Sequence, residues 1–357
     1  MISTSDNAES VLYHAVSSYQ LLEVMLHRLI VHSCERAVLL LPDFITEKYP
    51  QYKKLGRFFD RVCLFPYLHI PHGTEERILA DTTRHVQALF PAGLSAFSRI
   101  YTAGAHFYFS LYLIQNRLPF VFFEDAAGML SRADELFQTL SAKFPIHAEI
   151  AEKYGLFDAS QPLIRRIICL KRIQTRDVSG DRYQDFSVED ALLTLPDRQR
   201  NALIRFFLRH RIRTDAEAIL LTQQFAGLGL LRREEQIRLY ENLRDGVLRG
   251  VRLIIKKHPD DPLSYASVFP GVTVIKEIFP AELLPFVFRN KPEIVYTWDS
   301  TGCENLRKHF QIRKLGGETH AEKIGAAGGE FGLSAFDGRS SQTKFSDGLR
   351  NGAGFDR

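Results

Sequence analysis

The sequence has few residues of the kinds that mark disulfide-rich or metal-binding proteins. Its 357 residues include four cysteines, three methionines and one tryptophan. No CxxC pair and no cysteine–histidine spacing typical of a zinc site occurs among the cysteines, which are Cys34, Cys63, Cys169 and Cys303. We therefore expect neither a disulfide framework nor a zinc site, and a reducing cytoplasm fits this composition best.

The sequence also lacks hydrophobic runs of the length needed to cross a membrane. No stretch of 18 apolar residues occurs, and residues 1–10 are polar and acidic where a secretory signal would be basic and then apolar. The formal net charge of +4 is too small to indicate a nucleic-acid partner, although it permits contact with anionic lipid or phosphate. We expect a cytoplasmic protein without a nucleic-acid partner.

The length and the periodicity predict two α/β domains. A chain of 357 residues is longer than one ordinary hydrophobic core supports, and its apolar fraction of 45% is typical of globular proteins. Strand and helix patterns alternate over residues 1–150 and again over 215–312. Residues 151–214 have the pattern of a helical connecting region with clustered basic side chains, which form either a solvated helix face or a surface on an anionic membrane.

The carboxyl-terminal segment, residues 313–357, has a different composition. Ten of the 23 glycines fall within it, and it shows little apolar periodicity. Such a segment cannot form a regular core element. We expect a disordered tail, or a carboxyl end replaced by out-of-frame sequence, because an α/β half of this kind ordinarily continues with another strand and helix.

The first candidate motif follows a hydrophobic run at residues 119–123. This pattern predicts a buried strand, which ends in the adjacent acids Glu124 and Asp125 and a small-residue turn to Gly128. A carboxylate at such a strand end can be partly desolvated, which raises its pKa toward the value that a general base needs near neutral pH. The alternative is that Asp125 caps a following helix.

The second candidate motif follows residues 251–255, which predict another buried strand. The strand pattern stops at a polar cluster that we expect to lie outside it, Lys256-Lys257-His258-Pro259. Open α/β sheets bind ligands at the carboxyl ends of their strands, and cations beside an imidazole and a proline-fixed turn suit a phosphate group. The alternative is a basic turn in solvent.

The third candidate motif, Ser300 and Thr301, follows a predicted strand at residues 293–297. Hydroxyl groups and free backbone N–H groups at a helix start can hold phosphate, and a plain serine N-cap is the alternative. A different pair, His69 and His72, has the spacing of metal ligands. Because Pro71 prevents a regular helix between them, we expect no metal site there.

In their order and strand-end placement these three motifs resemble those of bacterial sialyltransferases that build Gram-negative surface glycans. These are the lipooligosaccharide sialyltransferases of glycosyltransferase family 52 and the related capsule polysialyltransferases. They share an acidic pair with glycine, a His-Pro pair and a later Ser-Ser/Thr pair, and the resemblance spans residues 10–310. It implies the GT-B fold, in which two Rossmann-like domains, the first on the acceptor side and the second binding the nucleotide, face each other across a cleft.

The resemblance further implies inverting transfer of sialic acid from CMP-sialic acid to a glycan hydroxyl group. One of the acidic pair, for which we favour Asp125 over Glu124, would deprotonate the acceptor, and His258 would assist departure of the CMP phosphate. The donor-binding residues that it implies are Lys256, Pro259, Ser300 and Thr301. No cofactor and no metal are expected. The implied partners are a nucleotide-sugar donor and a glycan acceptor, which could be lipid-linked at the inner membrane, and a homodimer is compatible with the resemblance.

The acidic motif departs from the family pattern at one point. Glycine normally follows the two acids directly, whereas Ala126 and Ala127 precede Gly128 here. If the turn required a positive φ at residue 126, the alanine would be strained and the acid displaced, and the protein would be an inactive relative. Two further alternatives are another GT-B transferase, such as a teichoic-acid type glycerophosphotransferase, and a non-catalytic remnant that binds glycan or membrane.

Overall fold

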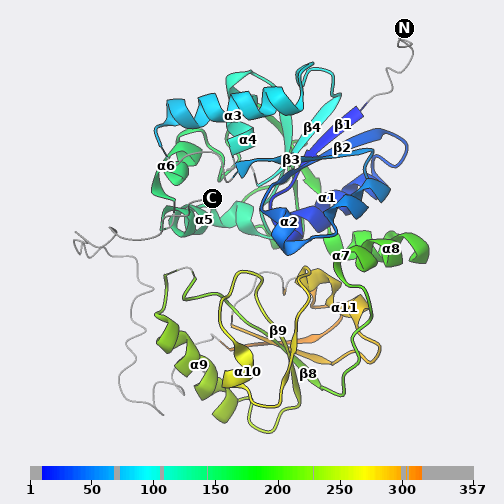
Figure 1. The fold of residues 1–357 in the computed structure, drawn as a ribbon, viewed down its shortest axis with the longest axis vertical. Coiled ribbons are helices and arrows are strands. Elements are labelled where there is room, and N and C mark those ends of the chain that lie inside the picture. Colours follow the sequence, from blue (N-terminus) through cyan, green and yellow to red (C-terminus); the bar gives the residue numbers. More distant parts are fainter. Residues whose placement is uncertain are drawn as a thin grey trace, which may run out of the picture. The chain divides into compact units, whose positions relative to one another are not determined.

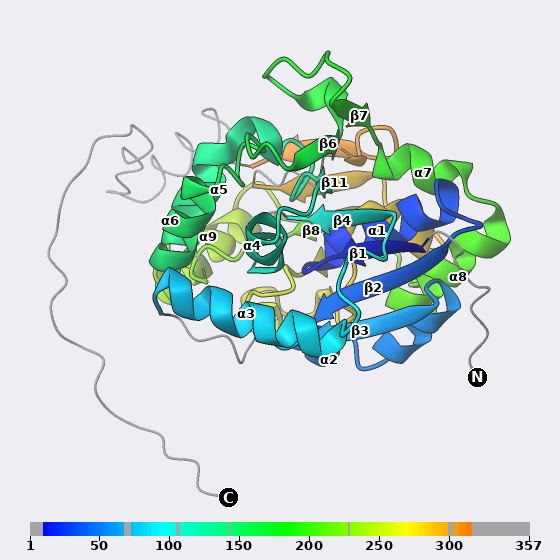
Figure 2. The same ribbon diagram turned by 90° about the horizontal axis from the view of Figure 1, so that it is seen from above.

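The structure, a computed structural model, describes residues 10–67, 73–104, 108–142, 144–227, 229–298, 303 and 305–315. These residues all belong to one compact unit, Met1–Leu315. They form two β-sheets with helices between successive strands, shown in Figures 1 and 2. Among the described helices, none combines the length and the apolar character needed to cross a membrane.

The first sheet has seven parallel strands in the order β3-β2-β1-β4-β5-β6-β7. Its strands are β1 Ser10–His14, β2 Arg36–Pro42, β3 Arg61–Phe65, β4 Arg99–Ala103, β5 Phe120–Phe123, β6 Ile164–Cys169 and β7 Tyr183–Asp185. Because side chains alternate along a strand, Val11 and Tyr13 join one hydrophobic cluster and Leu12 joins another on the opposite face. The sheet is therefore buried on both faces, as parallel sheets generally are.

Helices cover both faces of this sheet (Figure 1). The cluster that contains Leu12 is lined by α3 Glu75–Leu89, α4 Tyr108–Gln115 and α6 Pro145–Lys153. The cluster that contains Val11 is lined by α1 Ser18–Ile30, α7 Val188–Thr194 and α8 Asp197–Phe207. The remaining helices of this half are α2 Ile45–Lys48 and α5 Ala133–Ser141, with the 3₁₀ helices η1 Tyr52–Arg57, η3 Met129–Arg132 and η4 Lys171–Ile173.

The second sheet has five parallel strands in the order β10-β9-β8-β11-β12. Its strands are β8 Ala218–Leu221, β9 Leu253–Lys256, β10 Thr273–Ile275, β11 Ile294–Thr297 and β12 Gln311–Lys314. The helices of this half are α9 Arg233–Asp245, α10 Tyr265–Val268, η5 Ala281–Leu283 and α11 Leu284–Val287. Two parallel sheets, each with alternating helices, confirm the predicted pair of Rossmann-like domains.

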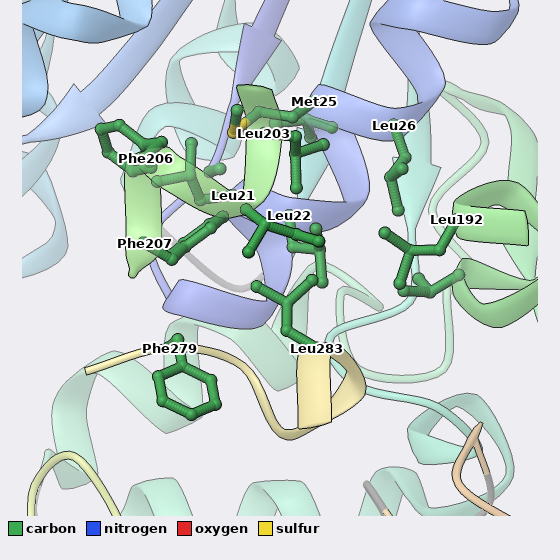
Figure 3. Packing of buried hydrophobic residues seen from close by; sticks show 14 of the residues in the cluster. Leu21, Leu22, Met25, Leu26, Leu192, Leu203, Phe206, Phe207, Phe279 and Leu283 are labelled. Atoms are coloured by element: carbon green, nitrogen blue, oxygen red, sulfur yellow. The ribbon is translucent and has the colours of Figure 1, made fainter. Parts of the chain in front are cut away.

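Helix α1 is shared by the cores of the two halves. It begins at a capping box, in which the Ser17 hydroxyl accepts the Gln20 N–H at 3.2 Å and the Gln20 side-chain oxygen accepts the Ser17 N–H at 3.1 Å. Its side chains Leu21 and Leu22 lie in one hydrophobic cluster with Phe279 and Leu283 of the second half (Figure 3). One continuous apolar core therefore joins the first sheet to the second half.

Three features differ from the sequence-based expectations. The segment 151–214, expected to be a helical connection, contributes β6 and β7, so the first sheet continues past residue 150 to Asp185. Strand β9 includes Lys256, which we expected to lie beyond the end of the strand. Strand β12 extends to Lys314, one residue into the segment 313–357 that we expected to be a tail.

Candidate active site

Glu124 follows β5 and holds the turn after it in place. Its side chain is 1% exposed, and its Oε1 accepts the N–H groups of Gly128 at 2.9 Å and Leu170 at 3.3 Å. Its Oε2 accepts a hydrogen bond from the Gln174 amide at 2.8 Å. Burial raises the pKa of Glu124 to about 7, and these hydrogen bonds oppose the rise. Because both of its carboxylate oxygens accept hydrogen bonds from the protein, Glu124 is suited to fixing the turn.

The glycine of the acidic motif supplies the left-handed backbone conformation of this turn. Gly128 has φ 84° and ψ 0°, and the Met129 N–H donates to the Ala126 carbonyl at 2.9 Å. These angles match the third position of a type II turn, which favours glycine. Among the described residues, the only non-glycine residues with positive φ are Arg117 and Ala159, so Ala126 is not strained in the way that the sequence suggested. The turn accommodates the two inserted alanines.

Asp125 differs from its neighbour because only one group of the described residues binds its carboxylate. The Gln20 amide at the start of α1 donates a hydrogen bond to Asp125 Oδ1. Burial raises the pKa of Asp125 to about 6, and the hydrogen bond from Gln20 opposes the rise. Asp125 does not cap a helix, since the next helical segment, η3, begins after Gly128. It is therefore a carboxylate with free accepting capacity and a pKa close to neutrality.

Lys256 ends β9 and is buried, with 6% of its surface exposed. Its ammonium nitrogen lies 4.4 Å from the centre of the Phe279 ring, and the nearby Glu282 attracts its charge. Burial lowers the pKa of Lys256 to about 8. Lys256 is thus still mostly protonated at pH 7 and places a poorly solvated positive charge at the carboxyl end of the second sheet.

His258 follows two residues later in a hydrogen-bonded turn. Its backbone N–H donates to the Thr222 hydroxyl at 3.1 Å, and its ring Nδ1 accepts the Asp260 N–H at 3.2 Å. Burial lowers the pKa of the ring, with opposing attraction from Asp260 and further lowering by the charge of Lys256. A neutral ring whose Nδ1 accepts a hydrogen bond carries its proton on Nε2. His258 can therefore donate a hydrogen bond at neutral pH.

Sequence reasoning missed two buried acids, Glu23 on α1 and Glu282 on η5. Glu23 is 2% exposed, and its Oε2 has no hydrogen-bond partner among the described residues. Burial, then repulsion from Glu124, Asp125 and Glu282, raises the pKa of Glu23 well above its ordinary value. The sequence did contain a signal, because Gln20 and Glu23 lie three residues apart in the apolar part of this helix.

Glu282 connects the acids of the first half to Lys256. Burial raises the pKa of Glu282 to about 7, and the charge of Lys256 opposes the rise. The charges of the acidic turn, α1, η5 and the end of β9 are therefore coupled to one another. No hydrogen bond joins Asp125 to His258 in the described part of the chain. An ion pair of 2.6 Å, Lys48 with Asp260, ties the His258 turn to α2 of the first half.

The remaining predicted site residues are only partly covered by the structure. Pro259 follows His258 in the same half-buried turn. Ser300 and Thr301 lie outside the described residues, as do His69 and His72. Within the described ranges no group of three His, Cys, Asp or Glu side chains is placed to hold a metal ion.

Comparison of sequences gives one weak relative. No family model matches the chain. An uncharacterized protein of Haemophilus influenzae is 24% identical over 136 residues, which are 37% of this chain and 43% of that protein. The aligned region thus spans less than half of the relative's length, and it assigns no activity.

Comparison of structures defines the class of fold. A Listeria monocytogenes protein, provisionally assigned as a UDP-N-acetylglucosamine 2-epimerase, aligns with a TM-score of 0.50 and 11% identity over 86% of this chain and 79% of its own. Medicago truncatula UGT71G1, solved with UDP-glucose, aligns with a TM-score of 0.50 and 13% identity over 87% of this chain and 81% of its own. The chain therefore has the two-domain, Rossmann-like α/β fold of GT-B glycosyltransferases.

Proposed function

We propose that this protein is an inverting glycosyltransferase that transfers sialic acid from CMP-sialic acid to a hydroxyl group of a surface glycan, either lipooligosaccharide or capsule. The observation that carries the proposal is the state of Asp125, a half-buried carboxylate with a pKa raised to about 6, to which only Gln20 donates a hydrogen bond among the described residues. A general base works best when its pKa lies near the operating pH. The resemblance of the three motifs to the sialyltransferases supplies the substrate.

Asp125 acts as the base in this proposal. It removes the proton from the acceptor hydroxyl as the oxygen attacks the anomeric carbon of the sugar. Glu124 keeps the β5 turn in shape through its bonds to Gly128, Leu170 and Gln174, so that the neighbouring carboxylate stays available. Attack from the side opposite to the departing phosphate inverts the anomeric centre.

Lys256 and His258 assist the departing nucleotide. The CMP phosphate gains negative charge as its bond to the sugar breaks, and preorganised donors stabilise that charge. Lys256 supplies a desolvated positive charge, and His258 supplies the Nε2–H as a hydrogen-bond donor. By resemblance, Pro259 shapes the turn and Ser300 and Thr301 bind the phosphate. The chemistry proposed for these residues requires no cofactor or metal ion, because Lys256 and His258 provide the charge and the donor.

The fold of the structural neighbours supports a nucleotide-sugar donor at a coarser level, because UGT71G1 was solved with UDP-glucose. The discriminating experiment incubates the protein with CMP-sialic acid and a lactose-like or sialylated acceptor and measures release of CMP and the sialylated product. Parallel reactions contain UDP-glucose or CDP-glycerol. Acceptor-dependent CMP release supports the proposal. If the protein turned over only UDP-glucose or CDP-glycerol, the proposed sialyltransferase activity would be wrong and the protein would be another GT-B transferase.

Two matched pairs of variants test the assigned roles. Asp125→Asn should lower kcat by about 10²- to 10⁴-fold, the usual contribution of a general base, while the exposed Asp134→Asn should not change it. His258→Ala should lower kcat, while the exposed His210→Ala should not. Equal donor hydrolysis by the wild type, Asp125→Asn and His258→Ala would instead identify a non-catalytic remnant that binds glycan or membrane.

The proposal also covers where the enzyme acts. A glycan acceptor attached to lipid would bring this cytoplasmic enzyme to the inner membrane as a peripheral protein, alone or as a homodimer. Sedimentation of the native protein with and without inner-membrane vesicles, together with its mass in solution, tests both points.

A further inference from the structure

A second site of concentrated charge lies outside the candidate active site, between η1 and α8. A cavity of about 190 Å³ is lined there by Lys54, Arg57, Phe58, Ala202, Arg205, Phe206 and Arg209. Its lining contains four cationic side chains and no carboxylate. At about 30 Å³ per water molecule the cavity holds about six waters, which is enough room for a phosphate group.

The spacing of the cations places them on two facing helical surfaces. Lys54 and Arg57 are three residues apart in the 3₁₀ helix η1, where residues at that interval share one face. Arg205 lies in the last turn of α8 and Arg209 follows four residues later, two residues beyond its end. The small side chain of Ala202, one turn before Arg205, leaves room between the charges.

The four cations have no acidic partners in the part of the chain that the structure describes. All four are exposed, and within the described residues none of them makes an ion pair with Asp or Glu. Like charges gathered around one cavity repel one another, which costs free energy unless an anion occupies the space between them. A bound phosphate would remove that cost, since Arg and Lys are the side chains that bind phosphate most strongly.

The two elements that line the cavity are joined behind it. The Gln51 amide, just before η1, donates a hydrogen bond to the Phe206 carbonyl of α8 at 2.9 Å. Tyr49 packs against the rings of Phe206 and Phe207 with centroids 5.4 and 5.5 Å apart. The elements that carry the cations are thus joined by a hydrogen bond and by buried aromatic packing, which keeps the two sides of the cavity next to each other.

We propose that Lys54, Arg57, Arg205 and Arg209 form a binding pocket for the phosphate group of an acidic ligand, separate from the donor site. Two sources present this chemistry, the headgroup of an anionic lipid and free inorganic phosphate or pyrophosphate. The pocket does not depend on the identity of the sugar donor, so it stands or fails independently of the proposed transferase activity.

The experiment compares the full-length protein with Arg57→Gln/Arg205→Gln. One arm titrates inorganic pyrophosphate by calorimetry, and the other measures sedimentation with phosphatidylcholine vesicles that contain or lack phosphatidylglycerol. Each cation near an anionic surface contributes about 1 kcal/mol, so removing two should weaken vesicle binding by about 30-fold. The control variant Arg233→Gln/Arg249→Gln removes two exposed charges from the second half and should bind like the wild type.

The outcomes distinguish the sources. Pyrophosphate binding that the double variant loses identifies a site for free phosphate, and vesicle binding that it loses identifies a lipid headgroup site. Ala202→Glu, which adds a carboxylate inside the cavity, should abolish either one while the protein stays folded. The proposal is overturned if the wild type binds neither probe, or if the control variant loses as much binding as the pocket variant.

Discussion

Two adjacent acids after β5 have different surroundings and therefore different expected roles. Within the described ranges Glu124 accepts three hydrogen bonds, whereas Asp125 accepts one, from Gln20. The sequence singled out the pair but gave no physical basis for choosing between them. The contacts of each carboxylate distinguish the two acids. Glu124 is anchored by Leu170 and Gln174, which are distant in sequence, whereas Asp125 can still accept further hydrogen bonds.

Glu124→Ala should destabilise the fold far more than Asp125→Asn. The alanine removes the acceptor of three hydrogen bonds, those from the buried N–H groups of Gly128 and Leu170 and from the Gln174 amide, which should cost at least about 3 kcal/mol at 1–3 kcal/mol for each unpaired group. Asparagine at position 125 can still accept the Gln20 hydrogen bond, so a loss below about 1 kcal/mol is expected. Urea denaturation measures the free energy of unfolding of both variants, and comparable losses of stability would contradict these roles.

The pH dependence of catalysis should be bell-shaped. Asp125 must be ionised to act as a base, so kcat/KM should rise with pH through about 6. Lys256 must keep its charge to stabilise the phosphate, so kcat/KM should fall as pH increases through about 8. Initial rates across this range test the expectation. An acidic limb that survives in the residual activity of Asp125→Asn would assign that limb to another group.

Glu282→Gln should stabilise the protein progressively as the pH rises. The folded-state pKa of Glu282 is raised from 4.5 to about 7, so the stability that its proton provides is complete below 4.5 and lost as pH increases through 7. Glutamine remains uncharged throughout, which should favour the variant by about 3 kcal/mol at pH 8. Unfolding at pH 4.5 and pH 8 measures the difference. The exposed Glu277→Gln serves as the control and should show no such trend.

At the scale of elements, the strand positions were largely predictable because buried parallel strands consist of short apolar runs. The predicted strands at 119–123, 251–255 and 293–297 correspond to β5, β9 and β11. Lys256 was placed outside its strand, because a lysine is ordinarily excluded from a buried one. Its burial depends on Phe279 and Glu282, which are distant in sequence.

Strand β6 was missed for a related reason. Its segment Ile164–Cys169 carries two adjacent exposed arginines, Arg165 and Arg166, which interrupt the apolar run and suggested a helix face. Pairing with β5 and β7 on its two sides determines the strand instead. The buried acid Glu282 was unpredictable for the same reason, since its significance arises from residues that only the fold brings together.

Gly128→Ala should strain the turn that carries the acids. Gly128 has a positive φ, and a Cβ there would lie 3.2 Å from Ile173 Cδ1, so a loss of about 1–2 kcal/mol is expected. Gly180→Ala is the matched control, because nothing lies within 4 Å of its added Cβ and its φ is not in the left-handed region. Denaturant titration measures both variants, and equal stabilities would show that the turn relaxes at no cost.

At the scale of the whole molecule, α1 and the cluster around it predict that the two halves unfold together. Leu21 and Leu22 share one core with Phe279 and Leu283 (Figure 3). Phe279→Ala should cost about 3–5 kcal/mol and lower the midpoint of a single transition. The largely exposed Leu193→Ala should cost less than about 0.5 kcal/mol. Calorimetry that resolves two separate transitions in the wild type would contradict a shared core.

The turn after β5 has a practical consequence for finding related chains. The left-handed residue stands three places after the second acid here, yet the glycine N–H still reaches back to Glu124. A search pattern that demands glycine immediately after the acids passes over such chains. A pattern that permits one or two small residues between the acids and the glycine also finds chains that keep the backbone geometry of this turn but differ in sequence.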